Sequence, residues 1–153
     1  MLPPALVGDW SGTNAFRLMP GDPPHEAPAT ARVSTAAGGH LALVAYAWHH
    51  PDDGPQDGLL VVAGTGEGDA VSATWADSWH QQPATMALTG RRTADGVVLE
   101  GRYGGDWTWR TELRTSPGGG LLLRMDNVVP VVHATAEVPA GPYAAMLLRA
   151  HRA

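Results

Sequence analysis

Residues 96–115 read GVVLEGRYGGDWTWRTELRT, and this stretch decides the fold class. Apolar and charged residues alternate on both sides of the glycine pair 104–105. Successive side chains of a strand point to opposite faces, so Trp107, Trp109 and Leu113 share one face while the charged residues between them share the other. The segment therefore predicts two antiparallel strands with an apolar inner face and a solvated outer face.

The same short, alternating pattern continues along the chain, and each run is closed by Gly, Pro, Asp or Asn, as is typical of all-β proteins. Residues 2–7 predict one helical turn before the first strand. Residues 1–153 are predicted to form one domain, an antiparallel meander that closes into a barrel or folds into a sandwich. The expected strands lie near residues 9–18, 29–36, 40–49, 58–65, 70–79, 84–92, 96–103, 106–115, 120–126, 129–137 and 142–150.

Composition excludes several classes of function. The net charge is −5, and no basic stripe marks a nucleic-acid binder. The chain has neither cysteine nor lysine, which excludes disulfides, thiolate catalysis and lysine Schiff bases. No signal peptide or membrane-length apolar run is visible, so no membrane partner is expected. We expect a bacterial, cytoplasmic protein, either a monomer or a homodimer.

Residues 6–13, LVGDWSGT, resemble the first strand of the calycin superfamily, which includes lipocalins, fatty-acid-binding proteins and nitrobindins. That strand carries a Gly-x-Trp element, here Gly8-Asp9-Trp10. Residues 74–80, TWADSWH, followed by Met86 and Gly90, resemble a bacterial group of calycin-like domains of unknown function. The resemblance implies about ten antiparallel strands around a ligand cavity, without implying a reaction.

The resemblance also implies particular roles for residues at the two ends of the barrel. Trp10 would close one end beside a basic side chain, for which Arg149 is the candidate through a cation–π contact. Nitrobindin-like relatives hold haem through a histidine near the start of the last strand. Tyr143 occupies that position here, so haem is disfavoured and no cofactor is expected.

Large side chains on the expected inner faces are the candidate ligand-binding residues. Indoles combine a flat apolar face with an N–H group, which suits a planar ligand, although they could equally fill a solid core. Small inward residues, expected at Ala42, Ala45, Ala73, Gly101 and Ala145, favour open space. The candidate set is Tyr46, Trp48, Trp75, Asp77, Trp79, Met86, Tyr103, Trp107, Trp109 and Met125.

Asp77 is the one candidate for catalysis. If Ser72, Thr74, Ser78 and His80 face outward, Asp77 points inward between Trp75 and Trp79, where burial would raise the pKa of its carboxyl unless a donor pairs with it. It could brace the wall, bind a ligand or act as an acid or base. On that alternation Ser78 and His80 point outward, and a Ser-His-Asp triad would require neighbouring residues on opposite faces to meet, which strand geometry disfavours.

The histidines show no metal-binding spacing. A metal site would need His80, His133 and a carboxylate to converge through folding, so no metal is expected. His49 and His50 are adjacent on a strand and should face opposite sides. The leading hypothesis is a small, largely apolar or aromatic ligand bound inside the barrel. The alternatives are a cofactor-independent isomerase or cyclase acting there and, more weakly, haem binding.

Overall fold

The structure is a computed structural model that describes residues 2–153. Ten antiparallel strands form a closed barrel in which each strand pairs with its neighbours in sequence and β1 pairs with β10. The strands are β1 (Gly8–Phe16), β2 (His25–Ala36), β3 (Leu41–His50), β4 (Gly54–Gly64), β5 (Ala70–Asp77), β6 (Met86–Arg92), β7 (Gly96–Tyr103), β8 (Trp107–Thr115), β9 (Leu121–Val129) and β10 (Gly141–Arg152). The fold class predicted from the sequence is confirmed.

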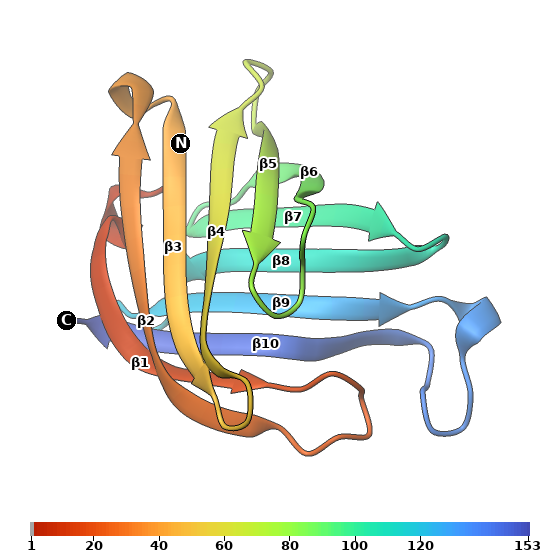
Figure 1. The fold of residues 1–153 in the computed structure, drawn as a ribbon. Helices are drawn as coiled ribbons and strands as arrows, with labels where there is room; N and C mark the ends of the chain where they lie inside the picture. The colour runs from red at the N-terminus through yellow and green to blue at the C-terminus, as the bar shows by residue number, and fades with distance from the viewer. Residues whose placement is uncertain (1) are drawn as a thin grey trace.

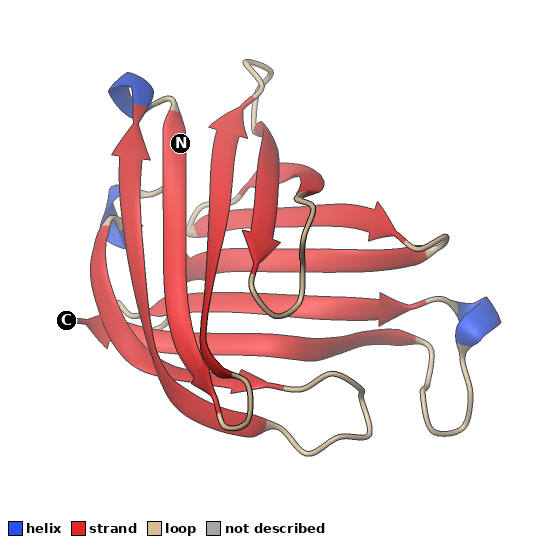
Figure 2. Cartoon of the chain, in the orientation of Figure 1, coloured by secondary structure: helices blue, strands red, loops and turns tan. Residues whose placement is uncertain are grey.

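The strands wrap steeply around the interior, so that β2–β5 cross β7–β10 in Figure 1. Figure 2 shows that helix is confined to short turns. These turns are η1 (Pro4–Leu6), η2 (Ala37–Gly39) and η3 (Val131–His133). The predicted N-terminal turn is η1.

Period-two burial follows the predicted alternation closely in β2, β3 and β8. Inward residues such as Leu99, Leu113 and Leu123 are completely buried and form one continuous core. Charged side chains such as Glu100 and Arg110 lie on the outer face and pair there. Ala45 is an exception to the prediction, because it lies on the exposed face of β3.

One end of the barrel, here named the closed end, is sealed by η1. The Trp10 indole donates to the Leu6 carbonyl at 2.9 Å, and the Arg152 guanidinium stacks 4.4 Å above the indole centroid. Gly8 leaves the space for this arginine, since a Cβ at Gly8 would overlap the guanidinium. A hollow of only about 10 Å³ remains nearby, too small for more than a single water.

The expected partner of Trp10 was wrong, because Arg149 is exposed on the outer face. The cause is a β-bulge in β10, where the register shifts between Ala144 and Met146. An extra residue reverses the alternation that follows it. After the bulge the even-numbered residues face inward, which brings Arg152 to Trp10.

The predicted strand at 129–137 was also wrong. β9 ends at Val129, and Pro130 follows without an amide donor for the ladder. The chain then forms η3 and a loop, in which Val131 and Val132 are exposed. This loop belongs to the opposite end of the barrel, here named the long-loop end, which carries loops 17–24, 51–53, 78–85, 104–106 and 130–140.

Candidate functional site

Aromatic side chains from five elements meet inside the long-loop end. Trp75 on β5 stacks on Trp109 of β8 with centroids 4.8 Å apart. Phe16 on β1 packs against Trp48 on β3 at 4.3 Å. The rings are in contact with one another, so the open space expected between the indoles is not a feature of this arrangement.

The chain turns sharply after β5 because the Asp77 carboxylate organises the next residues. Its Oδ1 accepts the backbone N–H groups of Trp79, His80 and Gln81. This local capping is typical of Asp, whose side chain competes with the ladder for nearby amides. β5 therefore ends at Asp77, two residues before the predicted end, and strand alternation no longer applies to His80.

His80 consequently points inward, and its predicted outward orientation was wrong. Its Nδ1 lies 2.9 Å from Asp77 Oδ2, with the two side chains only 4% and 1% exposed. The ring lies among indoles, with centroid distances of 4.6 Å to Trp79, 5.6 Å to Trp109 and 6.1 Å to Trp48. Asp77 and His80 thus form a buried acid–imidazole pair inside an aromatic shell.

Tyr46 extends this pair into a chain of hydrogen bonds. Tyr46 donates its hydroxyl hydrogen to Asp77 Oδ2 at 3.0 Å and accepts the Trp75 indole N–H at 2.8 Å. Burial acts to raise the pKa of Asp77, but the hydrogen bond and charge of His80 and the backbone amides outweigh it and lower the pKa. Burial and the Asp77 carboxylate raise the pKa of Tyr46 well above its usual value. Asp77 is therefore an ionised acceptor and Tyr46 a neutral donor.

Several buried polar atoms that face the interior have no partner among residues 2–153. They include the second imidazole nitrogen of His80, Nε2, and the indole nitrogens of Trp48 and Trp109. Thr111 Oγ1 and both amide atoms of Asn14 share this condition, and neither residue has exposed surface. Buried polar groups are normally hydrogen-bonded, so a set of unpaired atoms of this kind is unusual in a protein interior.

Trp79 covers this site from the loop at 78–85. Its ring meets Trp48 and His80 edge-on at 5.4 and 4.6 Å, and its N–H bonds Asp53 Oδ2 in the β3–β4 turn at 2.9 Å. His50 lies against the same ring at 5.0 Å. Trp79 is only partly buried, which makes it the boundary between the aromatic shell and solvent.

A second polar chain lies at the same end of the barrel. Tyr103 donates to Asn127 Oδ1 at 2.6 Å, and Asn127 Nδ2 donates to the Tyr143 hydroxyl at 3.1 Å. Tyr143 in turn donates to the Leu18 carbonyl at 2.6 Å. Trp107 stacks on His133 instead of joining the indole cluster.

Tyr143 does not fit the haem-ligand position that the family resemblance gives it. Its hydroxyl is already engaged with Asn127 and Leu18. Burial raises its pKa, which disfavours the tyrosinate that would bind iron.

The predicted residues therefore divide into separate groups. Tyr46, Trp48, Trp75, Asp77, Trp79 and Trp109 come together around His80. Tyr103 and Trp107 belong to the second polar chain and its edge, and Met86 and Met125 lie in the core. Sequence reasoning missed the inward placement of His80, and the signal that was available is Asp77 itself, because Asp side chains commonly bond the backbone a few residues further on.

The structure also places the remaining serine and histidine residues that the sequence analysis considered. Ser78 donates to Gln56 Oε1 and does not contact His80, so no triad forms. His133 stacks on Trp107 while His80 bonds Asp77, and residues 2–153 contain no cluster of three metal-ligating side chains. His49 is exposed and His50 turns inward, as expected for neighbours on a strand.

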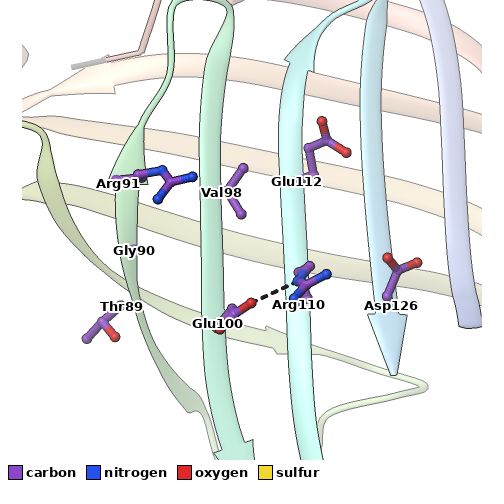
Figure 3. A pocket seen from close by; sticks show the side chains of 8 residues that line it. All are labelled: Thr89, Gly90, Arg91, Val98, Glu100, Arg110, Glu112 and Asp126. Carbon is purple, nitrogen blue, oxygen red and sulfur yellow. Dashed lines mark hydrogen bonds and ion pairs between the residues drawn. The ribbon is translucent and has the colours of Figure 1, made fainter. Parts of the chain in front are cut away.

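A surface hollow of about 720 Å³ lies on the outer faces of β6–β9 and is shown in Figure 3. Its Glu100 and Arg110 pair at 2.8 Å across exposed positions. Surface pairs of this kind contribute little energy, and the hollow has no buried unpaired group aimed into it. The buried cluster around His80 is therefore the stronger candidate.

No protein-family model matches the sequence, and no curated protein is found to be similar to it. Within residues 2–153, no helix has the length and apolar character needed to cross a membrane.

Proposed function

We propose that the barrel binds a small, largely apolar or aromatic molecule at its long-loop end, among Trp48, Trp75, Trp79, His80 and Trp109. The observation that carries the proposal is the unpaired state of three buried ring nitrogens in this aromatic shell. A buried donor left unpaired costs about 1–3 kcal/mol, and a ligand oxygen that accepts from an indole would recover much of this. Apolar side chains of similar size would avoid the cost altogether.

Burial of the ligand would supply most of the affinity. An aromatic ligand that buries about 200 Å² gains about 5 kcal/mol at roughly 25 cal/mol per Å². Because the rings are packed together, the ligand enters by displacing Trp79, which is attached to the 78–85 loop and held to Asp53 by one exposed hydrogen bond. We also propose that the protein is a calycin-like barrel, a proposal supported by the Gly8, Trp10 and Arg152 arrangement at the closed end.

The test is a titration with 1-anilinonaphthalene-8-sulfonate, an aromatic probe whose sulfonate accepts hydrogen bonds. We expect saturable binding of one probe, with energy transfer from tryptophan. Trp48→Phe and Trp109→Phe keep the ring face but remove the donor, and each should weaken binding by roughly tenfold, equivalent to about 1.4 kcal/mol.

Trp10→Phe is the matched control, since Trp10 lies at the closed end and already bonds Leu6. Its affinity for the probe should equal that of the wild type. Absence of saturable binding, or equal weakening in all three variants, would contradict the proposed site.

A further inference from the structure

We propose that the Asp77–His80 pair is a general base, and that the barrel catalyses a cofactor-independent isomerisation of a planar, β,γ-unsaturated carbonyl compound by proton transfer between its carbons. The inference rests on the proposed binding function and adds a reaction to it. Its basis is the placement of His80, whose two ring nitrogens have entirely different surroundings.

Asp77 fixes both the tautomer and the orientation of the imidazole. Its Oδ1 is held by three backbone amides, and its Oδ2 receives Tyr46 and His80 Nδ1. An ionised carboxylate only accepts hydrogen bonds, so in the neutral form of His80 the ring proton belongs on Nδ1. The lone pair of Nε2 is then free and directed away from Asp77, which is the arrangement of a histidine base oriented by a carboxylate.

The surroundings of Nε2 match the needs of carbon-acid chemistry. No protein atom among the described residues bonds this nitrogen, and the ring centroids of Trp48 and Trp109 lie 6.1 and 5.6 Å from that of the imidazole. The unpaired N–H groups of these indoles are the available donors for a negatively charged oxygen. A water-poor shell of this kind strengthens such electrostatic interactions.

The reaction balances without any further reagent. Nε2 removes a proton from the carbon that lies between the carbonyl and the C=C bond, and the C–H electron pair forms the new C=C bond of a conjugated dienolate. The carbonyl π electrons move to the oxygen, which accepts an indole N–H. The imidazolium then returns the same proton to the far carbon of the conjugated system, so that the product is an isomer of the substrate.

The test uses 5-nitrobenzisoxazole, a planar carbon acid that reports on buried bases. The base removes its ring C–H proton, the C–H electrons complete a nitrile, and the N–O bond breaks to give a coloured phenolate. We expect the wild-type protein to exceed the rate of free imidazole at equal concentration. His80→Gln should lose about 100-fold, within the usual range of about 10²–10⁴ for a general base. His49→Gln, which changes an exposed histidine on β3, should keep the full rate.

Asp77→Asn tests the positioning role of the carboxylate. With Oδ1 still held by the backbone, the Asn amide nitrogen would face His80 Nδ1 and move the imidazole proton to Nε2. Turnover should fall, and nitrogen-15 NMR should show the changed tautomer. A purely structural role of Asp77 would leave the tautomer of a folded variant unchanged.

The outcomes separate this inference from the binding proposal. A wild-type rate no greater than that of imidazole, or an unchanged rate in His80→Gln, overturns the proposal that His80 is a general base. If the protein still binds the anilinonaphthalene probe, the proposed binding site stands. If His80→Gln does not fold, the NMR tautomer of the wild-type protein decides. A proton on Nε2 refutes the inference, and a bare Nε2 together with turnover supports it.

Discussion

Replacement of Asp77 by asparagine should destabilise the barrel by about 3 kcal/mol at neutral pH. The three backbone amides at Oδ1 keep an acceptor, but the acceptor is no longer charged. Hydrogen bonds to charged groups contribute about 1.5–3 kcal/mol and neutral ones about 0.5–1.5, so each of the three bonds loses about 1 kcal/mol. At about 2–4 °C per kcal/mol for a chain of this size, the melting temperature should fall by about 6–12 °C.

The pH dependence provides a second, independent signature of this carboxylate. The folded-state pKa of Asp77 is lowered, so its stabilisation is complete above the unfolded value of about 3.9 and is lost as the pH falls through the folded value. The difference in stability between wild type and Asp77→Asn should therefore stay constant from pH 7 to about 5 and shrink below about 4.

Urea unfolding followed by circular dichroism at pH 7, 5 and 3 measures both effects. Asp106→Asn, at an exposed loop position, is the control and should change stability by less than about 0.5 kcal/mol. A loss below about 1 kcal/mol at pH 7, or a loss that stays the same at pH 3, would refute the account of Asp77 as a buried, ionised acceptor.

Three further changes test other parts of the structure. Gly58→Ala places a Cβ against the Tyr46 phenol and should cost about 1–3 kcal/mol in urea unfolding, whereas an unchanged midpoint would show that Tyr46 does not lie over this glycine. The pKa of Tyr46 is raised by burial, so the unfolded state releases this proton at a lower pH than the folded state does. The free energy of unfolding should therefore fall as the pH rises above about 10. Melting curves at alkaline pH would show this fall, which should be less steep in Tyr46→Phe. Arg152→Ala should lower the free energy of unfolding by about 1–2 kcal/mol, because it removes the contact with Trp10 and the bonds to the N-terminal segment. Arg149→Ala should leave the free energy of unfolding unchanged. Equal losses in the two variants would contradict the bulge assignment.

The barrel was predictable because strand alternation is a local property that survives in the folded chain. Trp107, Trp109 and Leu113 share a face in the sequence pattern, and Trp109 and Leu113 are buried as expected. The alternation fails where something interrupts a strand. The bulge at Ala144–Met146 reversed the face of every later residue in β10, and no residue type in that segment announces it.

The candidate site could be predicted only in part, for the same reason. Tyr46, Trp48 and Trp75 were placed correctly because they lie within uninterrupted strands. His80 was misplaced because Asp77 ends β5 by capturing the amides that follow it. The interruption that defeats the alternation also creates the site, since it turns a histidine back toward the carboxylate.

The turn after β5 both ends the strand and brings His80 to Asp77, so it does more than connect β5 to β6. Any short polar turn would join β5 to β6, and an apolar residue at position 80 would fill the same space without leaving a buried nitrogen unpaired. Asn14, Thr111, Trp48 and Trp109 repeat the pattern on other walls, where apolar residues of similar size would pack at lower cost. In a barrel that served only as a rigid scaffold, these unpaired polar side chains would lower stability without any compensating role. Their unpaired state in the interior is explained if the proposed ligand carries polar atoms that supply the missing hydrogen bonds.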